Sequence, residues 1–119
     1  MSSHGLLAQV DFAREIARFP PDGASGRRSE TLLKTPSFRV ILVTMRAGTA
    51  LHEHTAPGPI TVQPLQGRFT FILEDGERDL LPGTLIALDG GIRHAVRAEE
   101  DGAFLLTIAW REDTGDSTR

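Results

Sequence analysis

Three histidines of the 119-residue chain are candidates for a metal or ligand site because of their spacing. His52 and His54 stand two residues apart, and His94 follows a glycine pair. Imidazole nitrogens bind divalent transition metals, carry protons and hold polar ligands by hydrogen bonds. Alternate residues of a strand face the same side, so an extended segment 51–54 would present His52 and His54 together. With His94 they would form a site for one divalent transition metal (Zn, Fe, Ni, Cu or Mn), with a position open for water or substrate.

The same residues also fit a site that holds no metal. In this alternative, His54 and His94 line a polar pocket and hydrogen-bond a small molecule, while His52 is exposed. Gln63 stands in the middle of a strand-like run, where its amide could line the pocket or simply face water. The residues leave both alternatives open.

Composition excludes several other kinds of site and partner. The chain has no cysteine, which excludes disulfides, zinc fingers and thiol nucleophiles, and it has no GxSxG motif or phosphate-binding glycine loop. A net charge of -3 argues against nucleic acid as the partner. No apolar run is long enough for a membrane span, and the N-terminus does not resemble a secretion signal, so we expect a cytoplasmic protein that does not bind membranes.

Short strands must position the histidines. Runs rich in β-branched and aromatic residues are separated by Gly, Pro and Asp turns, a pattern typical of an antiparallel sandwich or barrel. The runs cover residues 29–35, 37–46, 60–66, 68–74, 77–81, 84–88, 93–98 and 103–110. Because the histidines flank different turns, a closed sheet could bring them together from distant segments.

The two ends of the chain differ from this middle part. Residues 6–18 have an amphipathic spacing that predicts one short helix, or a strand followed by a helical turn, and residues 19–29 predict a loop. We therefore divide the chain into an N-terminal arm and loop (1–28), one barrel (29–110) and a polar, flexible tail (111–119).

Two motifs give the chain a resemblance to a known family. Gly48 is followed by five residues and His54, and Gly67 completes that motif; later PGTLIALDGGIRHAV places Gly83, Gly91 and His94 at a second fixed spacing. In both spacing and character these motifs resemble those of a small single-domain cupin, over residues 37–109. The resemblance implies an all-β, jelly-roll barrel that holds a divalent metal in many members of the family.

The chain departs from the family's pattern at the ligand positions. Only His54 and His94 match them: the second histidine of the family falls on Ala56, and the glutamate falls on Ile60. The proline and asparagine of the second motif are Asp89 and Ala98. Loss of the glutamate removes the one anionic ligand that would offset the charge of a metal.

Three functions remain open. The first is a small-molecule or ion-binding protein without turnover; the second is a metal-dependent enzyme, of dioxygenase or isomerase type, built on His52, His54 and His94; the third is an assembly domain with a vestigial pocket. The missing ligands favour the first over the second.

We also expect a homodimer. Residues 103–109 (AFLLTIA) are apolar on both faces, so the strand would be covered by the barrel on one face and by a second subunit on the other. The resemblance supports this expectation, because barrels of this family often dimerise.

Overall fold

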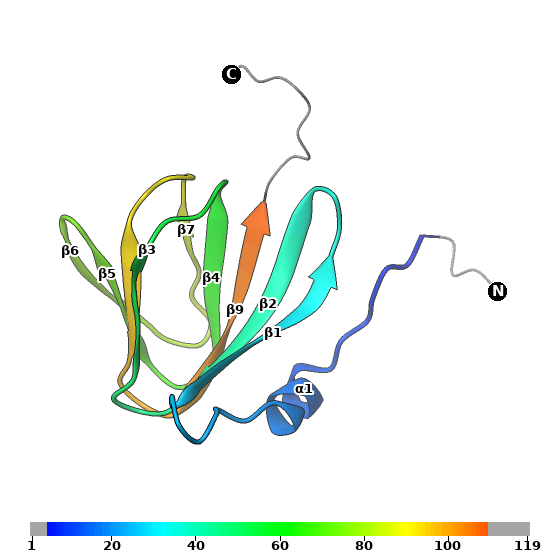
Figure 1. Ribbon diagram of the computed structural model, residues 1–119, viewed down its shortest axis with the longest axis horizontal. Helices are drawn as coiled ribbons and strands as arrows, with labels where there is room; N and C mark the ends of the chain where they lie inside the picture. Colours follow the sequence, from blue (N-terminus) through cyan, green and yellow to red (C-terminus); the bar gives the residue numbers. More distant parts are fainter. Residues whose placement is uncertain (1–4, 110–119) are drawn as a thin grey trace, which may run out of the picture.

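The computed structural model describes residues 5–109, except for the side chains of Glu53 and His54. Among these residues, one helix and nine strands form two antiparallel sheets that face each other (Figure 1). The elements are α1 (Phe12–Arg18), β1 (Arg27–Lys34), β2 (Phe38–Met45), β3 (Ala50–His54), β4 (Ile60–Gln66), β5 (Phe69–Leu73), β6 (Gly76–Leu80), β7 (Ile86–Leu88), β8 (His94–Ala98) and β9 (Gly102–Ala109). The predicted all-β, jelly-roll fold is confirmed.

The two sheets interleave strands that are distant in the sequence. The five-stranded sheet has the order β1-β2-β9-β4-β7, and the four-stranded sheet has the order β3-β8-β5-β6. Each strand pair is antiparallel. This order places β8, which begins at His94, between β3 and β5.

The core lies between the sheets and follows from the alternation of side chains along each strand. In β4, Val62 and Pro64 are buried while Gln63 between them is exposed, as expected for a strand with one face inward. The rings of Phe69 and Phe104 meet edge to face, with centroids 5.2 Å apart, and join the two sheets. Burying one such ring stabilises the fold by roughly 1.5–3 kcal/mol. The buried cluster comprises Val43, Met45, Ile60, Val62, Phe69, Phe71, Leu80, Val96, Ala98 and Phe104.

Gly67 forms the bend between β4 and β5 because no other residue fits there. Its φ is +79°, in the left-handed region, and a Cβ at this position would lie 2.5 Å from the carbonyl oxygen of Asp101. The close approach lets the turn before β9 pack against the end of β4.

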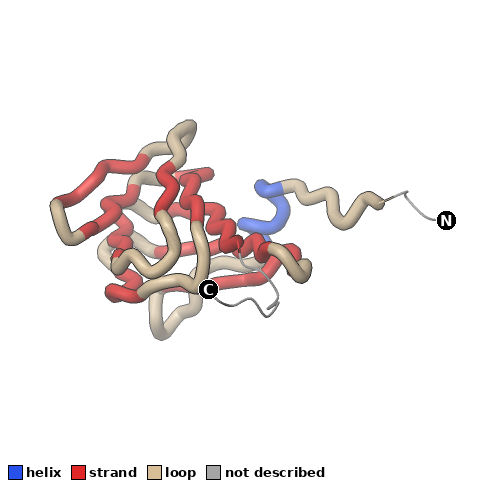
Figure 2. The backbone as a smooth tube through the Cα atoms, turned by 90° about the horizontal axis from the view of Figure 1, so that it is seen from above, coloured by secondary structure: helices blue, strands red, loops and turns tan. Residues whose placement is uncertain are grey.

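The helix predicted in residues 6–18 occupies only the second half of that segment. Asp11 caps it, since its Oδ1 accepts a hydrogen bond from the backbone N–H of Arg14 at 3.2 Å, and Pro20 follows its last turn. No residue of α1 is buried, and the arm before it extends away from the sheets (Figure 2). After the helix, Thr44 Oγ1 donates to the carbonyl of Phe19 at 2.8 Å and ties the chain to β2.

Within residues 5–109, we find no helix with the length and apolar character that a membrane crossing requires.

Candidate functional site

His94 is the best-defined member of the candidate site. It is the first residue of β8, is only 4% exposed, and stacks on Phe71 with ring centroids 5.5 Å apart and an interplanar angle of 13°. Its Nδ1 lies 3.0 Å from the carbonyl oxygen of Ile92. A carbonyl can only accept, so Nδ1–H donates. Whenever the ring is neutral, its lone pair is therefore on Nε2. Stacking and hydrogen bonding together fix the orientation of the imidazole.

His54 is placed next to His94 by the backbone. In the β3–β8 ladder the two residues are direct cross-strand partners, although they come from distant segments of the chain. The opposite end of β8 is marked by the hydrogen bond from Gly48 N–H to the carbonyl of Ala98, 2.9 Å long. We call the end of the two sheets at which β3 finishes and β8 begins the histidine end.

His52 does not follow the simple alternation that we predicted for residues 51–54. Leu51 pairs with Val96 and packs against the core, whereas the next pair is His54 with His94. One more residue separates these pairs in β3 than in β8, which is a β-bulge. The extra residue interrupts the alternation between His52 and His54, and His52 is exposed. Residues 51–54 are therefore not the regular extended segment on which the prediction of a shared face for His52 and His54 depends.

The side chains present do not fit the family's metal site. Ile60 occupies the place of the glutamate and is 3% exposed within the core, and Ala56 occupies the place of a histidine. Among the described side chains, no group of three or more His, Asp or Glu residues lies close enough to hold a metal. Two imidazoles without a carboxylate fall short of the three protein ligands that catalytic zinc sites use.

Two loops frame the histidine end. The backbone N–H of Gly91 donates to the carbonyl of Ala56 at 3.0 Å, which ties the turn before His94 to the segment after His54. Gly58 is buried, and a Cβ on Gly90 would lie 2.9 Å from its Cα. The two loops therefore pack backbone against backbone at Gly58 and Gly90.

Gln63 lies away from the histidines. It is exposed on the outer face of the five-stranded sheet, opposite Leu105 of β9, while its neighbours Val62 and Pro64 point into the core. The pocket role predicted for Gln63 would need the inner face, so we leave Gln63 out of the candidate site. Asp89 is also exposed, and its Oδ1 accepts from the backbone N–H of Gly90 at 2.9 Å.

Sequence reasoning missed Arg39. This residue precedes Val40 in β2, and it lies on the face that Ile41 and Val43 present to the core. Its Nε atom is buried. The signal was present in the sequence, since the alternation of the run 37–46 puts an arginine in register with inward-facing aliphatic residues.

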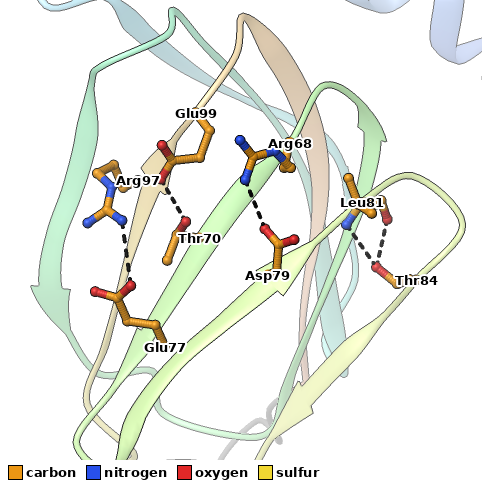
Figure 3. A network of polar contacts seen from close by, with 8 residues as sticks. All are labelled: Arg68, Thr70, Glu77, Asp79, Leu81, Thr84, Arg97 and Glu99. Carbon is orange, nitrogen blue, oxygen red and sulfur yellow. Dashed lines mark hydrogen bonds and ion pairs between the residues drawn. The ribbon is translucent and has the colours of Figure 1, made fainter.

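The other charged side chains of the four-stranded sheet form a network on its outer face (Figure 3). Thr70 Oγ1 donates to Glu99 Oε2 at 2.6 Å, and Arg97 Nε donates to the same oxygen at 2.7 Å. The hydrogen bond from Thr70 and then the one from Arg97 lower the pKa of Glu99. Arg97 also lies 3.6 Å from Glu77, and its pKa is raised, chiefly by its hydrogen bond to Glu99. This outward network supports the sheet and does not face the histidines.

Comparison with solved structures supports the fold. An RmlC-like cupin protein from Desulfovibrio desulfuricans is 26% identical, with a TM-score of 0.66 over 92% of this chain and 96% of that one. A conserved protein of unknown function from Streptococcus pyogenes gives a TM-score of 0.75 at 20% identity, covering 94% and 95% of the two chains. A cupin-2 domain protein from Shewanella frigidimarina gives 0.71 at 13% identity, covering 85% and 94%.

Sequence comparison adds nothing further, since no family model and no curated protein matches the chain. The order of the strands, the two motifs and the likeness to solved cupins agree with one another. The chain therefore has the fold of a small cupin domain.

Proposed function

We propose that this protein binds a small organic molecule at the histidine end without chemical turnover and without a resident metal. The proposal is supported by the contrast between two positions at which the family has metal ligands, Ile60 and His94. Ile60 replaces the anionic ligand and is buried in the core, whereas His94 is retained, buried and held in one orientation. Because the side chain of Ile60 stands where the family has an anionic metal-binding residue, the site favours an organic molecule over a metal ion.

The surroundings of His94 favour a ligand that is part apolar and part polar. Phe71 covers one face of the imidazole, and Leu73 and Ile60 pack against the same core. Sites for small molecules are commonly apolar, with a few polar groups that fix the orientation of the ligand. In this proposal the imidazoles of His54 and His94 supply those polar groups.

A second candidate is a metal-dependent enzyme of dioxygenase or isomerase type. The observation that favours it is the cross-strand pairing of His54 with His94, together with an Nδ1 contact that leaves the lone pair on Nε2 of His94. A bound metal would supply a Lewis acid at these imidazoles. This candidate is the weaker one, because the side chains of Ala56 and Ile60 have no atom that could bind a metal and the set of metal ligands stays incomplete.

Thermal denaturation in the presence of EDTA tests the proposal. A library of neutral and charged small molecules is screened against the wild type, His94→Ala and His52→Ala. A ligand present at 100 times its Kd stabilises the folded state by about 2.7 kcal/mol. We expect at least one compound to raise the Tm of the wild type and of His52→Ala but not that of His94→Ala.

Two outcomes would count against binding at the histidine end. Compounds that stabilise all three proteins equally bind elsewhere. Stabilisation that disappears in EDTA and returns with added metal would favour the enzyme candidate.

A further inference from the structure

We infer that the chain carries a second binding site, for a small zwitterion: an α-amino acid with an apolar side chain. The site is a cavity of about 270 Å³ between the N-terminal segment and the end of the five-stranded sheet. Arg46 and Asp101, which have opposite charges, line this cavity together with apolar residues. The inference goes beyond the proposed function, because it concerns a different part of the molecule.

The cavity lies at the end of the sheets opposite the histidine end. Met45 ends β2 and Gly102 begins β9, and both residues line the cavity. The N–H of Gly48 donates to the carbonyl of Ala98, the last residue of β8, so β8 also finishes at this end. His94 begins β8 at the other end. In Figure 1, α1 lies at the lower end of the five-stranded sheet, away from the arrowhead of β9.

The floor of the cavity is the outer face of the five-stranded sheet. Thr44 in β2 pairs with Ala103 in β9, and Ala103 pairs with Gln66 in β4. Cross-strand partners share one face, and this face is the outer one because the neighbouring Val43 and Phe104 pack in the core. Thr44 and Gln66 line the cavity. Ala103 stands between them with only a methyl group, which leaves room above β9.

Residues 16–21 form the roof of the cavity, and two contacts fix them to the sheet. Thr44 Oγ1 donates to the carbonyl of Phe19 at 2.8 Å. The guanidinium of Arg28 in β1 lies over the ring of Phe19, 5.4 Å from its centroid. The apolar residues that line the cavity from this side are Ile16, Pro20 and Pro21. Proline has a fixed φ, so two of these three residues make the wall rigid.

Arg46 and Asp101 supply one positive and one negative charge. The N–H of Arg46 donates to the carbonyl of Gly26 at 2.8 Å, which fixes its backbone. Asp101 Oδ1 accepts from the N–H of Ala47, the residue after Arg46, at 2.8 Å. Both side chains are exposed, and within residues 5–109 no ion pair joins Arg46 to Asp101 or to another carboxylate. Each charge therefore remains open to a ligand group of opposite charge.

These features together predict the class of the ligand. A carboxylate would pair with the guanidinium of Arg46, and an ammonium group would pair with the carboxylate of Asp101. An apolar side chain would pack against the roof at Ile16. The volume of the cavity lies below the roughly 300–1,000 Å³ of pockets for drug-sized ligands, so a molecule of the size of an amino acid suits it. We choose L-leucine as the probe.

The experiment is an NMR titration of the full chain with L-leucine and with two analogues that carry one charge each. Isocaproate lacks the ammonium group, and L-leucinamide lacks the carboxylate. The methyl groups of Ile16 and the backbone amide of Gly102 report binding in the cavity, whereas the ring of His94 reports binding at the histidine end.

Two variants separate the two charges. Arg46→Met removes the cation, and Asp101→Asn removes the anion but keeps an oxygen that can accept from Ala47. Arg78→Met is the control, because it removes an exposed arginine that pairs with Asp75 on the other sheet. Thermal denaturation establishes that each variant is folded.

For the wild type and Arg78→Met, we expect L-leucine to bind at least about threefold more tightly than either analogue. Arg46→Met should bind L-leucine and L-leucinamide equally and still prefer L-leucine to isocaproate. Asp101→Asn should bind L-leucine and isocaproate equally and still prefer L-leucine to L-leucinamide. The shifts should occur at Ile16 and Gly102 and not at His94.

The inference is overturned if L-leucine does not bind, if it binds no more tightly than the two analogues, or if the shifts occur at His94 instead. It is also overturned if Arg46→Met and Asp101→Asn keep both preferences. The comparison of the three probes on the wild type decides the matter even where a variant does not fold. Each of these failures leaves the proposed function standing, because the thermal screen with His94→Ala tests the histidine end separately.

Discussion

His54 stands directly opposite His94 in the β3–β8 ladder, and this pairing exists because β3 bulges between Leu51 and His54. Without the bulge, the regular register after Leu51 would place Glu53 opposite His94. The bulge therefore selects which residue of the segment 52–54 meets His94. It also separates His52 from the pair.

Replacing Ala56 by histidine should create a metal site. Ala56 holds the family's second histidine position, two residues after His54, and it packs against the core near the turn that leads to His94. Ala56→His would supply a third imidazole, the number found in the catalytic zinc site of three histidines. We expect the affinity for Zn²⁺, measured by calorimetric titration, to rise at least about tenfold.

The control is the double variant Ala56→His with His52→Ala. Because His52 is exposed and lies across the bulge, its loss should leave the new site unchanged. A gain in Zn²⁺ affinity that depends on His52, or no gain at all, would contradict the described geometry.

Gly90→Ala should destabilise the loops that frame the histidine end. The added methyl group would lie 2.9 Å from the Cα of Gly58, closer than side-chain carbons pack. We expect a loss of about 1–3 kcal/mol in the free energy of unfolding, measured by urea denaturation. Gly23→Ala is the matched control, since nothing lies within 4 Å of its Cβ position. Equal stability of the two variants would show that the loops do not pack as described.

Thr70→Val should reduce the sensitivity of the fold to acid. The hydrogen bond from Thr70 is the largest cause of the lowered pKa of Glu99. A carboxyl with a lowered pKa in the folded state stabilises the fold above its unfolded pKa, near 4.5, and this contribution is lost as the pH falls through the folded value. The wild type should therefore lose more stability than Thr70→Val below pH 4.5 in urea denaturation at a series of pH values.

Thr31→Val serves as the control for that comparison, because Thr31 is exposed on β1 and far from Glu99 in the sheet order. Its pH profile should follow the wild type. If the pH profile of Thr70→Val also follows that of the wild type, the hydrogen bond from Thr70 does not lower the pKa of Glu99.

The strands were predictable because their signal is local. Alternation and turn residues such as Gly76 and Gly91 located β2 and β4 to β9 within a few residues. Met45, Phe69 and Phe71, which belong to these predicted strands, are buried in the core. The same alternation places Arg39 on the inner face, but we did not predict this position because charged residues usually face water.

The bulge and the helix were less predictable. A bulge in β3 depends on which residues of β8 it pairs with, and that information is absent from residues 50–54 alone. The segment 6–18 carries helical spacing throughout, but only the part after the cap at Asp11 forms α1. Trp110 and the tail lie outside the described residues, and so does the side chain of His54.

The homodimer stays a prediction, and the outer face of the five-stranded sheet is where it can be tested. Leu105 lies there opposite Leu42, half-buried, on the central strand β9. Covering the exposed part of Leu105 with a second copy would remove apolar surface from water. We expect sedimentation equilibrium to give twice the chain mass of 13.0 kDa for the wild type and a monomer for Leu105→Glu.

Leu85→Glu is the control for this experiment, because Leu85 is 56% exposed between β6 and β7 and lies on a different part of the surface. It should remain dimeric. A monomeric wild type would contradict the prediction directly.

Metal content is the measurement that tests the central claim most directly, since the proposed function holds that His54 and His94 act without a resident metal. The protein is purified without chelator and without a histidine tag, and its transition metals are quantified by mass spectrometry. We predict far less than one equivalent per chain. About one equivalent, lost in both His54→Ala and His94→Ala, would contradict the account and establish a metal centre at the histidine end.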